Sequence, residues 1–240
     1  MDFQELNYQT VTTRNRELAM SEAFPVLMRK VYLWMTLALL ITGFTAYAVA
    51  TTPQLTNLIF ANQAVVWILF GAELLLVFGL SAAINRLSLL TATLMFILYS
   101  VINGAVLSVI FFAYSIGSIA TTFFITAGTF GAMSLYGYFT KSDLTSWGKI
   151  LIMALIGIII ATVVNIFVKS SGLDLIISYA GVLIFVGLTA YDTQKIKTMC
   201  LQAPDAGESM QKIALLGALS LYLDFINLFI YLLRILGRRE

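Results

Sequence analysis

Four ionisable residues of this sequence stand inside or at the end of long apolar stretches, where charge is costly. Glu73 lies in WILFGAELLLVFGL and Asp192 in GLTAYDTQKIK, while Asp224 lies in ALSLYLDFINLFIYLLR, which Arg234 ends. Ionisable residues in such positions usually mark an ion path, a proton relay or a binding site. The chain has no histidine and a single cysteine, Cys200. These residues could therefore support proton exchange and cation binding by carboxylates. The usual His and Cys ligands of a zinc site and an internal disulfide are excluded.

The last apolar stretch carries its polar residues on one face. Projected at about 100° per residue, they fall within an arc of about 100° and leave the remaining surface to Leu, Phe and Ile. These residues are Gly217, Ser220, Asp224, Asn227, Tyr231 and Arg234. A polar stripe on a helix in lipid is expected to face the interior of a helix bundle or a water-filled cavity.

Other apolar stretches contain polar positions that could meet this stripe. They are Ser178, Gly181, Thr189 and Asp192, then Ser100, Asn103, Gly104 and Ser108, and finally Thr162 and Asn165. Because the last two stretches follow one another, they are expected to be antiparallel neighbours, which would bring Asp192 near Asp224. Two carboxylates in a poorly hydrated site cannot both ionise freely, so the pair would titrate as a unit and form a proton-sensitive latch. In the alternative, each aspartate simply caps or hydrogen-bonds a neighbouring helix.

The same carboxylates, with nearby amides, also suit a cation path. Calcium prefers several oxygen ligands from carboxylates and carbonyl groups. The candidate ligands are Asp192 and Asp224, and the candidate path residues are Glu73, Asn103, Asn165 and Asn227. Spacing alone leaves calcium, sodium and protons open.

The composition requires that most of the molecular surface face lipid. Hydrophobic residues make up 60% of the chain and charged residues 11%, against roughly 25% charged residues in soluble proteins. Seven segments reach the length of about 20 apolar residues that a spanning helix needs. They are residues 28–50, 63–84, 88–113, 116–139, 149–168, 174–194 and 213–236. These segments are continuously apolar and lack the alternation of apolar and polar residues that is typical of β-barrel strands, so a β-barrel is disfavoured.

We therefore predict an all-α, polytopic membrane protein, a seven-transmembrane helical bundle. Residues 1–25 form a polar cytoplasmic segment and residues 26–240 the transmembrane domain. Short turns are expected between the spans, and only the connection 195–212 is predicted to be long and polar. Glycines at helical spacing are predicted to let neighbouring helices pack closely. They are Gly128, Gly131, Gly157, Gly181 and Gly187.

Basic residues predict the orientation, because they gather on the cytoplasmic side of a membrane. With a cytoplasmic N-terminus, ten of the fourteen Lys and Arg residues fall on the cytoplasmic side. The other four are Lys169, Arg234, Arg238 and Arg239. The basic C-terminal tail runs against the rule, so the last helix either spans or re-enters; we favour spanning.

Two long blocks of the sequence resemble the signature of the Bax inhibitor-1 family. They are SYAGVLIFVGLTAYDTQKIK (178–197) and ALSLYLDFINLFIYLLRILG (218–237), and residues 103–144 and VNIF (164–167) agree with them. The resemblance implies a seven-helix bundle with the last helix near the centre and a pH-sensitive calcium leak through the membrane. It also implies that the aspartates of the YD and LYLDFIN motifs, here Asp192 and Asp224, pair as a proton-sensing latch.

The resemblance extends to three further residues. Arg234 matches an arginine ten residues after the second aspartate, and Glu73 matches a glutamate that lines the ion path. Arg86 is the nearest match to the family's helix-two arginine, displaced by about two residues. The short chain is similar to bacterial members, which implies a bacterial cytoplasmic (inner) membrane.

Three other function classes compete with a leak channel. Bacterial relatives are taken to restrain a membrane-bound ATP-dependent protease, and eukaryotic ones to modulate stress or cell-death machinery, neither of which requires ion passage. A proton-coupled transporter would also use buried carboxylates. An enzyme is disfavoured because the sequence has no metal set, nucleophile–base pair or phosphate loop. We expect no cofactor; the expected partners are the lipid bilayer and calcium or protons, and a net charge of +2 points away from nucleic acid.

Overall fold

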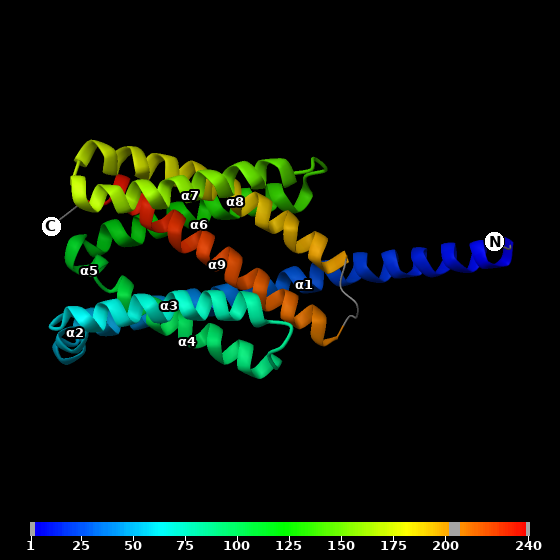
Figure 1. Cartoon of the computed structure of the whole chain (residues 1–240), viewed down its shortest axis with the longest axis horizontal. Helices are drawn as coiled ribbons and strands as arrows, with labels where there is room; N and C mark the ends of the chain where they lie inside the picture. Colours follow the sequence, from blue (N-terminus) through cyan, green and yellow to red (C-terminus); the bar gives the residue numbers. More distant parts are fainter. Residues whose placement is uncertain (1–2, 202–206, 239–240) are drawn as a thin grey trace.

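The long apolar runs of the sequence form long helices. The structure is a computed structural model that describes residues 3–201 and 207–238, with side chains for residues 24–200 and 207–238. The helices of this part of the chain, shown in Figure 1, are α1 (Phe3–Thr51), α2 (Pro53–Phe60), α3 (Gln63–Ala83), α4 (Leu89–Leu107), α5 (Ile110–Ala113), α6 (Ile116–Phe139), α7 (Thr145–Val168), α8 (Ser171–Leu201) and α9 (Glu208–Leu236).

Seven helical segments in the described part of the chain are long and apolar enough to cross a membrane. They are Phe24–Thr51, Gln63–Ala83, Leu89–Ala113, Ile116–Phe139, Thr145–Val168, Ser171–Cys200 and Glu208–Leu236. Each overlaps one of the seven predicted segments, so the predicted all-α bundle of seven spans is confirmed. The side chains of residues 1–23 lie outside the described residues, and the predicted polar N-terminal segment stays a prediction.

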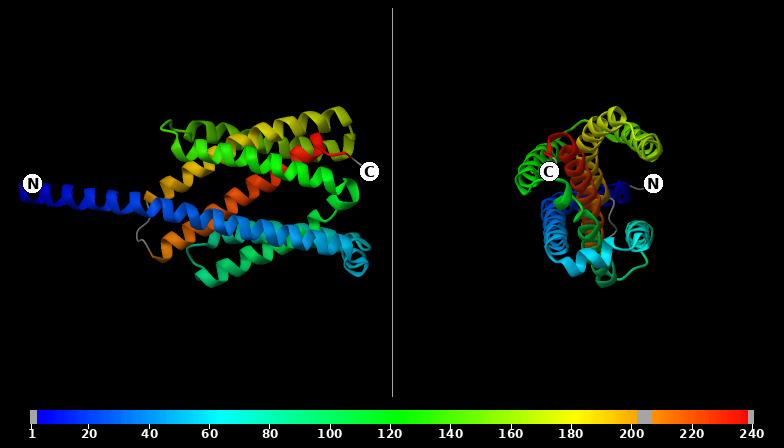
Figure 2. Two further views of the ribbon diagram at one scale, coloured as in Figure 1. Left: turned by 180° about the vertical axis from the view of Figure 1, so that it is seen from behind. Right: turned by 90° about the vertical axis from the view of Figure 1, so that its left-hand side faces the viewer.

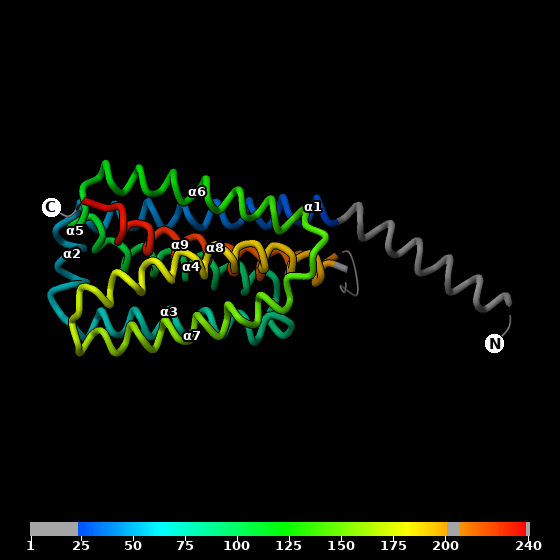
Figure 3. Tube along the Cα trace, turned by 90° about the horizontal axis from the view of Figure 1, so that it is seen from above, coloured from blue at the N-terminus to red at the C-terminus, as the bar shows by residue number. Residues whose placement is uncertain are grey.

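The last helix, α9, lies at the centre of the bundle. It packs against α1, α4, α6 and α8. In the end view of Figure 2 and the view from above in Figure 3, α1 and α6 lie on one side of α9, and α3 and α7 lie on the other. Within the most apolar window of α9, 67% of the residues are buried, against 6% for α3 and α7. The central position of the last helix is therefore confirmed, and α9 runs as one helix from Glu208 to Leu236.

The predicted long connection at residues 195–212 is wrong, because helix occupies most of it. α8 continues to Leu201 and α9 already begins at Glu208. Three apolar residues within the predicted loop are buried in the core, namely Ile196, Cys200 and Met210. The Cys200 Sγ atom lies 3.8 Å from the Met210 Sδ atom. Burial of these side chains extends both helices past the charged residues that had suggested a loop.

Two local features of the structure differ from the prediction. A short helix replaces the turn predicted before the second span, and the predicted third span is interrupted. Pro53 begins the short helix α2, where proline is favoured because the first helical residue needs no backbone donor. The predicted helix 88–113 is divided at Ser108, between α4 and α5. The Ser108 hydroxyl donates to the Ala105 carbonyl oxygen at 2.7 Å, which competes with the helical backbone pattern.

The glycine prediction holds in one helix and fails in two. In α8, a Cβ atom on Gly181 would meet the Tyr231 ring, and one on Gly187 would meet Leu151. At Gly128 and Gly131 of α6 and Gly157 of α7, a Cβ atom would meet no heavy atom within 4 Å. The first pair lets neighbouring helices approach closely, whereas the other three face open space.

Candidate functional site

The most unusual buried group in the bundle is the carboxylate of Asp224, near the middle of α9. Its side chain is 4% exposed, and its Oδ2 atom has no hydrogen-bond partner among the described residues. An unpaired buried carboxylate oxygen is expensive unless a proton or a cation reaches it. Asp224 lines a cavity of about 490 Å³ from which a proton or cation could do so.

This cavity, called here the polar cavity, lies between α3, α7, α8 and α9, with Tyr99 contributed by α4. Leu, Ile, Val and Phe side chains form much of its wall, and polar side chains converge from three helices. The polar group consists of Glu73, Asp192, Lys195, Ser220, Asp224, Asn227 and Tyr231. Four of these belong to the stripe predicted on the last helix, so the prediction that the stripe turns inward is confirmed.

Asp192 and Asp224 reach the polar cavity from adjacent helices, α8 and α9. Their carboxylates lie near enough for their charges to interact. The Ser220 hydroxyl is hydrogen-bonded to Asp192. The structure therefore brings together the two aspartates that the sequence had singled out.

Lys195 is a functional candidate that the sequence reading placed in a loop. It follows Asp192 by three residues on the same face of α8, so helical spacing was the signal that could have found it. Its Nζ atom lies 6.0 Å from the centre of the Tyr191 ring. Lys195 also interacts electrostatically with both aspartates. An exposed ammonium group thus stands within electrostatic reach of both carboxylates.

A smaller cavity of about 210 Å³ adjoins the polar cavity. Asp192, Lys195 and Ser220 line both spaces, so these three side chains form the boundary between them. Gly217 of the predicted stripe lines the smaller space, together with Ser81 of α3. The two cavities therefore adjoin one another beside α9.

Glu73 is fixed by a hydrogen-bond network that joins four helices. Asn103 Nδ2 donates to Glu73 Oε1 at 2.8 Å, and the Tyr222 hydroxyl donates to Asn103 Oδ1 at 2.9 Å. The Tyr222 hydroxyl also lies 2.6 Å from Thr42 Oγ1, which donates to the Ser100 carbonyl oxygen. Asn103 therefore supports Glu73 from behind the cavity wall. Tyr222 is fully buried. The sequence did not predict its part in this network, because a tyrosine in an apolar stretch is usually a core residue.

Three candidates lie away from the polar cavity. Arg234 pairs with Asp174 at the start of α8, with 3.4 Å between Nη1 and Oδ1. Asn165 lies near the end of α7, where its Oδ1 accepts from the Ser170 backbone N–H at 3.0 Å. Arg86 is exposed in the turn between α3 and α4. The structure therefore gives Arg234 and Asn165 structural partners instead of contacts with the aspartate pair.

The polar cavity offers few ligands for a resident metal ion. In the described part of the chain, no three His, Cys, Asp or Glu side chains lie close enough together to hold one. Calcium usually takes six to eight oxygen ligands. Asp192 and Asp224 supply carboxylate oxygens, with Ser220 and Asn227 beside them.

Comparison with known proteins finds relatives of this sequence. The family model described as "Inhibitor of apoptosis-promoting Bax1" (Bax1-I) matches residues 25–240. The inner membrane protein YbhL of Escherichia coli K12 is 52% identical over 214 residues, which cover 89% of this chain and 92% of YbhL. A Borreliella burgdorferi protein is 47% identical over 234 residues, covering 96% of this chain and 98% of its own length. A Rickettsia prowazekii protein is 44% identical over 232 residues, with coverages of 97% and 98%.

Proposed function

This chain belongs to the Bax inhibitor-1 family, and from that premise we propose that it is a pH-sensitive cation leak channel of a bacterial inner membrane. Calcium is the proposed ion, and Asp192 and Asp224 are the proposed proton sensor. The similarity to YbhL, which is described as an inner membrane protein, supports this location. The observation that carries the proposal is the unpaired, buried Asp224 oxygen in a cavity that it shares with Asp192.

The larger and smaller cavities supply the proposed path. Glu73 and Asn227 provide oxygen atoms in the polar cavity, where a cation can exchange part of its hydration shell for protein ligands. A cation moving on must pass the boundary of Asp192, Lys195 and Ser220. The ammonium group of Lys195 repels a cation there, so the arrangement described here represents a closed state.

Protonation of the aspartate pair supplies the proposed gate. A proton shared by the two carboxylates ties α8 to α9 through a charge-assisted hydrogen bond, which is roughly twice as strong as a neutral one. A second proton, taken up as the pH falls, removes that charge and leaves only neutral bonds. The helices then separate more easily, which widens the boundary between the two cavities. Cation leak is therefore expected to rise as the pH falls.

Flux into liposomes tests this proposal. The purified protein is reconstituted with a trapped calcium indicator, and calcium influx is recorded across about one pH unit on either side of neutrality. If one proton controls the gate, influx changes by at most about tenfold per pH unit. Asp192→Asn and Asp224→Asn are expected to flatten this dependence, because an amide cannot take part in the shared-proton bond.

Asp174→Asn is the matched control, because Asp174 lies on α8 but outside the polar cavity and is paired with Arg234. It should keep the wild-type pH dependence. A pH profile that survives both cavity substitutions would reject the latch. No influx above that of empty liposomes at any pH would reject the channel and favour restraint of a membrane-bound protease.

A further inference from the structure

A second large cavity lies on the opposite side of α9, between α1 and α6. Its volume is about 430 Å³, within the range typical of ligand-binding pockets. We propose that it binds one acyl chain of an anionic phospholipid, whose phosphate is held by Arg29. The proposal concerns lipid binding and does not depend on ion flux.

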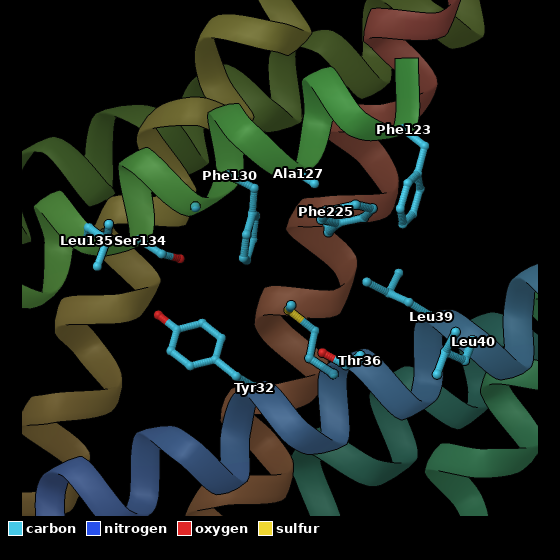
Figure 4. A pocket seen from close by; sticks show the side chains of 12 residues that line it. Tyr32, Thr36, Leu39, Leu40, Phe123, Ala127, Phe130, Ser134, Leu135 and Phe225 are labelled. Carbon is cyan, nitrogen blue, oxygen red and sulfur yellow. The ribbon is translucent and has the colours of Figure 1, made fainter. Parts of the chain in front are cut away.

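The walls of this cavity, called here the apolar cavity, match a hydrocarbon chain. Leu39 of α1, Phe123 and Phe130 of α6 and Phe225 of α9 point into it, as Figure 4 shows. Two further lining residues lie on the outer surface of the bundle: Leu40 is 64% exposed and Leu135 is 60% exposed. These helices span the membrane, so the opening beside these leucines faces lipid rather than water.

The dimensions of the apolar cavity also suit one acyl chain. Along α1 its lining runs from Tyr32 to Leu40, a distance of about 12 Å at a helical rise of about 1.5 Å per residue. One leaflet of a bilayer contributes about half of the hydrocarbon thickness of about 30 Å. The cavity therefore accommodates most of the length of a chain that enters from the surrounding leaflet.

One end of the apolar cavity is polar. The Tyr32 hydroxyl points toward Ser134 in Figure 4 and is hydrogen-bonded to Ser134 and Thr193. Tyrosine in this position is typical of the level where acyl chains give way to headgroups. A lipid chain in the cavity would therefore carry its ester and phosphate groups past Tyr32, toward the preceding turn of α1.

Arg29 stands where that phosphate would arrive. It is exposed and precedes Thr36 and Leu40 by seven and eleven residues, so the three residues share one face of α1 to within about 20°. Arg29 lies three residues before Tyr32, about 4.5 Å further along α1 on the polar side of the cavity. Guanidinium groups bind phosphate through paired hydrogen bonds. This complementarity favours an anionic phospholipid over a neutral one.

A substitution at Gly131 tests occupancy of the apolar cavity. Gly131 lines the cavity, and a Cβ atom there meets no heavy atom within 4 Å, so Gly131→Leu fills the space without a clash at its Cβ atom. Gly128→Leu is the matched control, because it is equally open and on the same helix but does not line the cavity. Native mass spectrometry of the full protein in detergent would measure bound phosphatidylglycerol and phosphatidylcholine.

We expect wild type and Gly128→Leu to bind phosphatidylglycerol, and Gly131→Leu to bind it at least about tenfold more weakly. Phosphatidylglycerol binding by Gly131→Leu at the wild-type level would mean surface lipid only and would overturn the proposal. An equal loss in both glycine variants would show that the loss does not come from filling the cavity, and would overturn it as well. Arg29→Gln should reduce phosphatidylglycerol binding to the level of phosphatidylcholine, while Lys30→Gln, pointing about 100° away, should not. A lipid preference that survives Arg29→Gln would overturn the assignment of the headgroup site.

Discussion

At the residue scale, the unusual feature is a lysine placed among carboxylates. Lys195 lines both the polar cavity and its smaller neighbour and interacts with Asp192 and Asp224. A positive charge at this boundary offsets the negative charge that would otherwise collect cations there. On the proposed channel function, Lys195 would set the closed state and the aspartate pair its response to protons.

Replacing Lys195 tests this role. On the proposed channel function, Lys195→Gln removes the repulsive charge and should raise calcium influx at neutral pH several-fold, because the barrier at the boundary falls. Lys197→Gln is the control, since Lys197 lies outside both cavities, with its Nζ atom 5.8 Å from the centre of the Phe24 ring. The liposome assay measures both variants. Equal or lower influx through Lys195→Gln would contradict the role.

Asp143 is a carboxylate with a structural role at the start of α7. It precedes α7, and its Oδ1 atom accepts the Thr145 backbone N–H at 2.9 Å. Hydrogen bonds from the Thr145 side chain and backbone to the charged form hold the pKa of Asp143 below its usual value. A lowered pKa in the folded state contributes stability that is present at neutral pH and is lost as the pH falls through that pKa.

We therefore expect Asp143→Ala to lower the melting temperature in detergent at pH 7, with a smaller difference from wild type near pH 3. Asp143→Asn keeps an acceptor for the Thr145 N–H without a charge, so its melting temperature should follow pH less steeply than that of wild type. Thermal unfolding over a pH series measures both effects. If the melting temperature of Asp143→Ala falls further below that of wild type as the pH is lowered, the proposed stabilising role of the Asp143–Thr145 hydrogen bond is wrong.

At the element scale, close helix approaches hold the bundle together. Gly137 of α6 packs against the backbone of Ala190 in α8. A Cβ atom at Gly137 would clash with backbone atoms, which cannot rotate away as a side chain can. Gly137→Ala should therefore force α6 and α8 apart, at a cost of about 1–3 kcal/mol or more.

The expected result is a melting temperature for Gly137→Ala several degrees below that of wild type. Gly128→Ala, which adds the same methyl group to α6 in open space, should change it little or raise it slightly, because alanine favours helix over glycine. Scanning calorimetry or fluorescence in detergent compares the two. Equal melting temperatures would show that the α6–α8 contact tolerates expansion.

At the scale of the whole molecule, the sequence predicted the spans and the stripe on α9, because both follow from periodic local patterns. The prediction for residues 195–212 was wrong, because the charged residues there suggested a loop although Ile196 and Met210 are buried. The sequence could not assign Asp174 to Arg234, since these residues are 60 positions apart and meet only through packing. The apolar cavity was missed for the same reason, because it depends on how α1, α6 and α9 fit together.

The central helix has a mechanical consequence. α9 forms part of the wall of the polar cavity through Asp224 and part of the wall of the apolar cavity through the adjacent Phe225. A shift of α9 toward α3 and α7 narrows the first space and widens the second. Lateral pressure from the surrounding acyl chains, which varies with temperature and fatty-acid composition, therefore acts on a wall of the polar cavity. On the proposed function, membrane fluidity would then tune the gate as well as protons.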